Sequence, residues 1–333
     1  MDELNKLIVS SRVRIARNIE GLPFKTRQRN VFDGISDTIK RKNRAFVSTP
    51  VSELDPGMAK ALFEQHLISR ELLNNKINSV IVASTDNKVV VMLGEEDHIR
   101  IQSIQTGYSL YPAFESAKKI ANDIEAEHDT AYRDDFGYLT SCPTNIGTGM
   151  RASVMMFLPA LTITEQIDST IERLLVNYSN HITVRGMYGE GSEAGGYMYQ
   201  ISNQSCFGMR EEQILKMVET VTLQIARDEL KAQAAILKSS SDKLADRVMR
   251  SWGILTNALM LSSAESVEHL AVLKLGACLD IIKFKNVRVL DDLFFVLQPN
   301  TLVAVDERAA DTDTRDKLRA KRAKEILLAS RVK

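Results

Sequence analysis

The chain has 333 residues, with 43 basic and 43 acidic side chains, so its formal net charge is zero. Apolar residues make up 44% and charged residues 26%, which is typical of folded globular proteins and excludes disordered and fibrous classes. The neutral balance argues against direct nucleic-acid binding, and the apolar runs are too short to span a membrane. No apolar leader is visible near Met1, and three widely spaced cysteines form neither a disulfide framework nor a metal motif, so we expect a cytoplasmic protein.

Apolar periodicity predicts the elements of the chain in order. Strands are expected at 79–84, 88–94, 99–105, 137–142, 152–158, 182–185 and 197–202. Helices are expected at 112–128, about 165–177, 241–261 and 265–279, with a helical face that begins at 215. The mixture lacks a regular βα alternation, so it predicts an α+β fold with a mostly antiparallel sheet flanked by helices. We expect this domain to cover 1–230 and a helical domain to cover 231–333.

Arginine recurs at the ends of the expected strands, beside turns rich in glycine or carboxylates. Arg12 and Arg14 are two residues apart, so an extended segment places both on one face. Arg100, Arg151 and Arg185 each adjoin such a turn. A single arginine of this kind is usually a surface residue, but five in similar settings suggest guanidinium forks that bind a triphosphate. The sequence lacks the P-loop and dinucleotide motifs that would bind phosphate by other means.

Two carboxylates in the same turns, Glu96 and Glu190, would repel phosphate and therefore suit a cationic acceptor. A guanidinium acceptor stays protonated at any working pH, so it must be aligned and lose a proton before it can attack. Glu96 and Glu190 could do both, and a thiolate at Cys142 could add a third negative contact.

Four segments carry a family resemblance: SSRVRIARN, EEDHIRIQS, CPTNIGTGMRASV and RGMYGEGSEAGG, which begin at residues 10, 95, 142 and 185. They resemble the phosphagen (guanidino) kinase family, and more closely its bacterial branch, the McsB-type protein arginine kinases. EQHLIS at 64–69 is similar to the same branch. The resemblance implies a protein arginine kinase, a phosphotransferase that uses ATP with Mg²⁺ held mainly through the nucleotide phosphates and without a protein metal site.

Carried over position by position, the resemblance implies two sets of site residues. The catalytic set is Glu96, Glu190 and Cys142. The ATP-binding set is Ser10, Ser11, Arg12, Val13, Arg14, His66, Arg100, Arg151, Ala152, Ser153, Val154, Met155, Arg185, Gly186, Met187, Tyr188 and Gly189. Tyr188 stands where the small-molecule kinases have a second arginine, so the role of that arginine does not carry over.

The basic tail contains RDxxRA, which in the McsB-type proteins marks an allosteric phosphoarginine pocket. Here the pattern gives Arg315, Asp316, Arg319 and Ala320. We expect Asp313 to cap a helix in a capping box with Asp316, so that Arg315 lies in the first turn and Arg319 one turn later. Two arginines at a helix N-terminus would suit an anion, although a solvated basic helix is the alternative.

The resemblance also implies partners and leaves two other functions open. The partners are protein substrates with exposed arginines, an activator protein, a heat-shock repressor, a Clp-type unfoldase–protease and further copies of the chain. One alternative is a kinase of free arginine or another small guanidino compound. Against it stand Tyr188, the tail motif and the start of the first arginine motif at Ser10, where small-molecule kinases carry a preceding helical domain. The other is a silent phosphoarginine-binding adaptor, which the intact Glu96, Glu190 and Cys142 disfavour.

Overall fold

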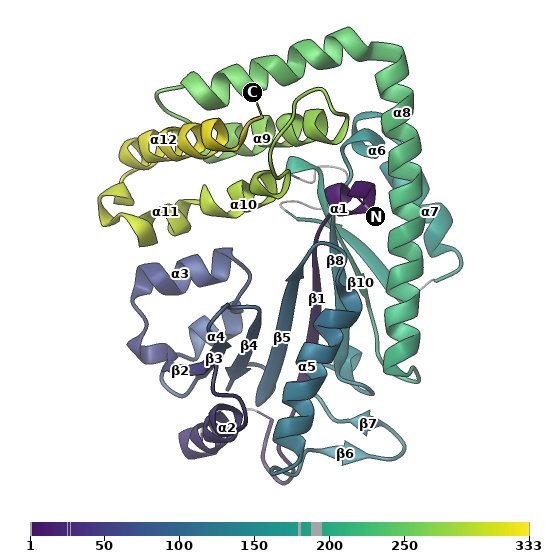
Figure 1. The fold of residues 1–333 in the computed structure, drawn as a ribbon. Coiled ribbons are helices and arrows are strands. Elements are labelled where there is room, and N and C mark those ends of the chain that lie inside the picture. The colour runs from purple at the N-terminus through teal and green to yellow at the C-terminus, as the bar shows by residue number, and fades with distance from the viewer. Residues whose placement is uncertain (1, 25, 27, 179–180, 188–194, 333) are drawn as a thin grey trace.

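The computed structural model describes residues 2–24, 26, 28–178, 181–187 and 195–332. Its centre is an eight-stranded sheet in the order β2-β3-β4-β5-β1-β8-β10-β9, and each neighbouring pair is antiparallel (Figure 1). The strands are β1 (Ile8–Arg17), β2 (Phe46–Pro50), β3 (Val80–Ser84), β4 (Val89–Leu93), β5 (Ile99–Thr106), β8 (Met150–Phe157), β9 (Ile182–Gly186) and β10 (Met198–Asn203). A separate hairpin pairs β6 (Tyr132–Arg133) with β7 (Gly137–Tyr138).

Helices surround this sheet and form a layer beyond one of its ends (Figure 1). Those that precede residue 210 are α1 (Asp2–Leu7), α2 (Arg29–Lys42), α3 (Pro56–Glu64), α4 (Arg70–Asn74), α5 (Leu110–Glu125), α6 (Pro159–Ile163) and α7 (Ile167–Leu175). Those that follow are α8 (Glu211–Asn257), α9 (Ser263–Cys278), α10 (Arg288–Val296), α11 (Pro299–Val305) and α12 (Thr312–Ser330). Short 3₁₀ turns occur at Val51–Glu53, Pro143–Asn145, Gly195–Tyr197 and Glu307–Ala310.

One face of the sheet carries the main core, because apolar residues occupy alternate positions along its strands. Val13 and Ile15 of β1 are fully buried, as is Val154 of β8 beside them. Helix α5 covers this face with the stripe that its spacing predicts, which includes Ala117 and Ala121. The opposite face of β1 and β8 is therefore free to carry polar side chains.

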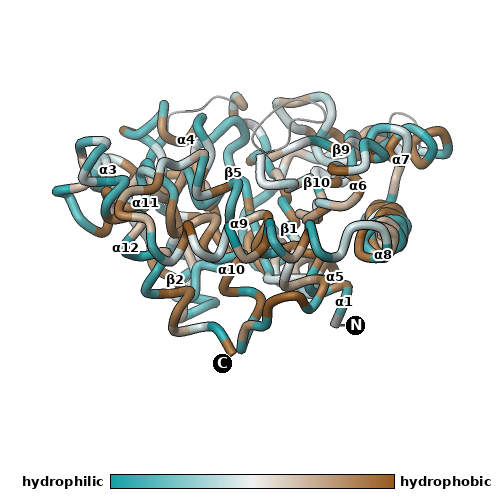
Figure 2. Tube along the Cα trace, turned by 90° about the horizontal axis from the view of Figure 1, so that it is seen from above, coloured by the Kyte–Doolittle hydropathy of each residue, from teal (hydrophilic) through white to brown (hydrophobic). Residues whose placement is uncertain are grey.

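A second core joins the sheet to the C-terminal helices. Val9 and Phe157 pack with Val248 and Trp252 of α8 and with residues of α9, α10 and α12. Seen from above, these helices lie over the end of the sheet (Figure 2). Helix α8 serves both cores, since Val218 packs against the sheet, and its backbone departs from helical geometry at Ser240.

The α+β class with an antiparallel sheet is confirmed, and the expected strands and helices are present except for part of one strand. The strand predicted for 137–142 is wrong beyond Tyr138, because the backbone amide of Ser141 donates to Asp97 and turns the chain into a loop. Helix α8 crosses residue 231, where we predicted a domain boundary. That boundary stays a prediction.

A buried ion pair in the second core gives a stability prediction. Lys274 of α9 is fully buried, contacts Asp291 of α10 and lies 4.5 Å from the centre of the Phe157 ring. Lys274→Met would leave a buried carboxylate without its partner, so we expect the free energy of unfolding to fall by about 3–5 kcal/mol. Urea denaturation measures this. Lys6→Met, which breaks the exposed pair with Asp280, is the control and should change stability by about 1 kcal/mol or less; an equal loss in both variants would contradict the prediction.

Candidate active site

The five predicted arginines lie on one face of the sheet, which we call the arginine row: Arg12, Arg14, Arg100, Arg151 and Arg185. The strand register shows this directly. Arg14 pairs with Arg151 across β1 and β8, and Arg100 of β5 pairs with Ala16, two residues after Arg14. Arg185 pairs with Gln200, and Gln200 accepts a hydrogen bond from Nη2 of Arg12 at 3.1 Å. Because side chains alternate between faces, all five guanidinium groups face the side away from the main core.

The row concentrates positive charge that the described residues only partly compensate. Burial, followed by repulsion from Arg100 and Arg151, lowers the pKa of Arg12 to about 10. Arg14 and Arg151 also have lowered pKa values, with burial as the largest cause. The Nε atoms of Arg14 and Arg151 are buried without a hydrogen-bond partner among the described residues. Desolvated cations with unused donors fit a polyphosphate anion well.

One end of the row is bounded by the turn that carries Glu96. Arg100 forms an ion pair with Glu95, which also accepts from the Glu96 amide at 2.8 Å. This leaves the Glu96 carboxylate exposed and without an arginine partner among the described residues. Partial desolvation of that carboxyl, and then repulsion from Asp97 and Glu95, raise its pKa, and Arg100 offsets part of the rise. The sequence alone did not indicate that Glu95, rather than Glu96, would hold Arg100.

A buried polar network joins this turn to the loop of Cys142. Asp97 accepts from the Asn18 amide group and from the Ser141 backbone, both at 2.7 Å. Ser141 in turn donates its hydroxyl to the Glu96 carbonyl at 2.8 Å. Cys142, the next residue, is partly exposed, and its Sγ lies 3.0 Å from Thr144 Oγ1. The structure therefore brings Glu96 and Cys142 together at one end of the arginine row.

A sixth arginine, Arg17, supports the same loop from the core side. It donates to the Thr148 carbonyl at 2.9 Å and to Glu125 at 2.5 Å, and its guanidinium carbon lies 3.3 Å from the centre of the Tyr138 ring. Sequence analysis gave Arg17 no role. Its spacing of three residues from Arg14 was the available signal, because an odd spacing puts a strand residue on the opposite face.

The other predicted ATP positions divide in two according to the same alternation. Ser11, Val13, Ala152 and Val154 are buried, and their side chains lie on the core face, so only their backbone adjoins the row. Ser10, Ser153 and Met155 are on the row side, and Ser153 Oγ lies 3.4 Å from Arg12 Nε. Gly186 pairs with Tyr199, and Met187 packs against the second core. Tyr188, Gly189 and Glu190 lie outside the described residues.

A cavity of about 510 Å³ adjoins the row at Arg12. Ser10, Ser153, Met155 and His66 line it, as predicted nucleotide contacts would. Burial and repulsion from Arg12 and Arg14 lower the pKa of His66 to about 4, so its ring is neutral at ordinary pH. The residues fit a nucleotide whose phosphates lie on the row.

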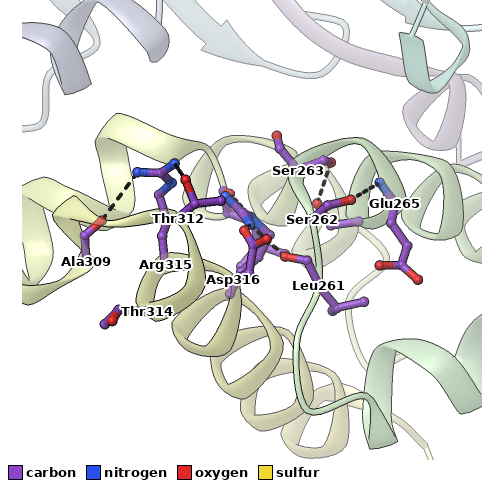
Figure 3. Close-up of polar contacts among 12 residues, drawn as sticks. Leu261, Ser262, Ser263, Glu265, Ala309, Thr312, Thr314, Arg315 and Asp316 are labelled. Atoms are coloured by element: carbon purple, nitrogen blue, oxygen red, sulfur yellow. Dashed lines mark hydrogen bonds and ion pairs between the residues drawn. The ribbon is translucent and has the colours of Figure 1, made fainter.

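The tail motif lies near the start of α12 (Figure 3). The predicted cap is wrong: Asp311, not Asp313, accepts from the Thr314 amide at 2.9 Å and begins the helix. Arg315 is partly exposed and donates to Ala310 O at 3.2 Å and to Thr312 Oγ1 at 3.3 Å.

Arg319 is almost fully buried and acts as an internal clamp. Its guanidinium donates to the carbonyls of Leu261 and Leu297 and contacts Asp316, while Ala320 packs in the second core. Helix periodicity could not reveal this burial.

Comparison with known proteins decides the family. Residues 28–232 match the model of the ATP:guanido phosphotransferase C-terminal catalytic domain, and residues 241–332 match the protein-arginine kinase McsB C-terminal domain. The chain is 39% identical to the protein-arginine kinase of Bacillus subtilis (strain 168), over 96% of this chain and 90% of that relative. It is 37% identical to the protein-arginine kinase of Moorella thermoacetica, over 96% of this chain and 94% of that relative. The chain belongs to the protein-arginine kinase family.

Solved structures support the fold of this family member. Lombricine kinase aligns with a TM-score of 0.60 at 24% identity, over 69% of this chain and 68% of that chain. The duplicated taurocyamine kinase of Schistosoma mansoni, with bound transition state analog components, also gives 0.60 at 23% identity, over 74% of this chain and 37% of that chain. Both are phosphagen kinases, as the predicted fold class requires.

In the part of the chain that the structure describes, no helix is long and apolar enough to cross a membrane. The same residues contain no group of three or more His, Cys, Asp and Glu side chains that could hold a metal ion.

Proposed function

We propose that this chain transfers the γ-phosphoryl group of ATP to arginine side chains of other proteins. One observation carries the proposal: a row of five arginines, three of which have lowered pKa values because they are buried, ends at the turn that presents Glu96 beside Cys142. A phosphate site next to a free carboxylate suits a reaction between an anionic donor and a cationic acceptor.

Each part of the site would have a distinct role. The arginine row would bind the triphosphate and neutralise charge on the transferring group, with Mg²⁺ held mainly through the phosphates. Glu96 would orient the acceptor guanidinium and accept its proton, together with Glu190 as the second carboxylate of the pair. Cys142 would add a polar contact to the acceptor. Alignment would supply most of the rate, because phosphoryl transfer needs little covalent chemistry from the protein.

The test compares two acceptors under conditions that preserve the acid-labile N–P bond. We expect phosphate transfer from ATP to an unfolded, arginine-rich protein and much less transfer to free arginine. Preference for free arginine would instead favour the small-molecule alternative, and transfer to neither would favour the silent adaptor.

The partners and the location follow from the same proposal. An activator protein, a heat-shock repressor as substrate and a Clp-type unfoldase–protease that reads the mark would all act with this chain in the cytoplasm, as would further copies of the chain. The three free cysteines suit that reducing compartment.

The tail motif is proposed as a product-sensing site with unequal roles for its arginines. Arg315 would contact the phosphate of a phosphoarginine, because its side chain is partly exposed and its Nε has no partner among the described residues. Arg319 would instead hold α12 in place through Leu261 and Leu297.

Arg315→Ala should abolish binding of phosphoarginine and any stimulation by it, while ATP binding stays unchanged. Calorimetric titration of phosphoarginine into a Glu96→Ala background measures phosphoarginine binding without turnover. Arg322→Ala, two residues beyond the end of the motif on α12, is the control. Unaltered phosphoarginine binding in Arg315→Ala would leave the tail as a solvated basic helix.

A further inference from the structure

The cavity beside the arginine row has walls from both parts of the chain. The sheet contributes Arg12 and Met155, and the loop after α3 contributes His66. Helix α10, in the C-terminal part, contributes Asp292 and Phe295. The rings of Phe295 and His66 pack edge to face with 6.2 Å between their centres, so the two walls are in contact. The cavity is therefore formed only when α10 is docked.

The position of Arg12 indicates which part of a nucleotide this cavity would bind. Of the five row arginines it is the one that lines the cavity, so a triphosphate on the row would leave its nucleoside here. Met155, Ile104 and Phe295 offer the apolar surfaces that a purine base requires.

The two carboxylates of α10 in the cavity differ in their surroundings. Asp291 is buried against Lys274. Asp292 is exposed, and no hydrogen bond or ion pair joins it to another described residue. A free carboxylate would repel phosphate, so it suits a hydrogen-bond donor of the nucleoside: a ribose hydroxyl or the exocyclic amine of adenine.

One contact at the start of α10 and another at the start of α11 hold this region against the catalytic part. Arg288, the first residue of α10, donates to Asn5 at 3.3 Å. Glu64, at the end of α3, accepts from the Thr301 amide at 2.8 Å and from Asn300 at 2.5 Å, which ties α3 to the start of α11. His66 follows Glu64 by two residues, so this contact also places the opposite wall of the cavity.

We propose that α10 forms one wall of the nucleoside site and that Asp292 accepts a hydrogen bond from the nucleoside of bound ATP. This inference rests on the proposed function, since it assumes that ATP is the donor. It makes the C-terminal helices part of nucleotide recognition rather than a separate module.

Calorimetric titration of three nucleotides with Mg²⁺ tests the proposal: ATP, 2′,3′-dideoxy-ATP, which lacks the ribose hydroxyls, and ITP, which lacks the exocyclic amine. Asp292→Ala should weaken ATP binding by about 10- to 100-fold, the usual range for a hydrogen bond to a charged group. It should weaken the analogue that lacks the recognised donor much less, which identifies that donor. Asp292→Asn should retain part of the affinity, and Glu325→Ala on α12, whose carboxylate is exposed, is the control.

The outcomes separate this inference from the proposed function. Equal ATP affinity in wild type and Asp292→Ala would overturn the contact. Equal weakening of all three nucleotides would also overturn it, because it would indicate a general effect of the substitution. Failure of the wild-type protein to bind ATP would refute the proposed function itself.

Discussion

Glu96→Ala should lower turnover on a protein substrate by about 10²-fold or more, the usual scale for a general base that also positions its substrate. ATP affinity should change little, because Arg100 is held by Glu95 and not by Glu96. Steady-state kinetics with an arginine-rich protein, together with ATP titration, measures both quantities.

The control for this change is Glu20→Ala, which removes an exposed carboxylate from the turn after β1. A pH profile adds a second readout. The raised pKa of Glu96 means that kcat/KM should fall on the acid side at a higher pH than it would for an unshifted glutamate, as the base becomes protonated. Near wild-type turnover in Glu96→Ala would show that this carboxylate does not contact the acceptor.

Arg151→Lys should lower kcat/KM by roughly 10²-fold, comparable to the loss of one donor that stabilises transition-state charge. Lysine keeps the charge but loses the planar fork. Nη2 of Arg151 donates to Ser202 Oγ at 2.9 Å, and its buried Nε has no partner among the described residues, so it can donate to a ligand. The single ammonium group of lysine cannot make both of these hydrogen bonds at once. Kinetics with varied ATP measures the loss.

Arg173→Lys is the matched control, since Arg173 forms an exposed ion pair with Asp228 and should tolerate the exchange. If Arg151→Lys were as active as this control, the role of Arg151 would be one of charge alone.

Local patterns predicted most of the sheet and the arginine row. The alternation of Arg12 and Arg14 with Val13 is encoded within a few residues, and strand period alone puts both arginines on one face. The helical spacing of α5 is equally local.

Features that depend on distant contacts could not be predicted in this way. The loop that replaces the expected strand after Tyr138 forms because Asp97, far away in sequence, captures the Ser141 amide. From the sequence, Arg319 was expected to bind a phosphate, but its guanidinium donates hydrogen bonds to the carbonyls of Leu261 and Leu297 instead. The choice of Glu95 over Glu96 as the partner of Arg100 likewise depends on how the turn packs.

The position of β1 has a consequence for how the protein is made. This strand is the first of the sheet to be synthesised, yet it lies at the centre between β5 and β8. The strand-pairing partners of Arg14 are Gln102 and Arg151, which are synthesised later. Arg151 follows Arg14 by roughly 140 residues, and at usual translation speeds this delay is on the order of ten seconds. During that interval the apolar side of β1 lacks its neighbours and is open to aggregation. Nascent chains that end before β8 should therefore depend on chaperones, and the arginine row is complete only after β9, which carries Arg185, has left the ribosome.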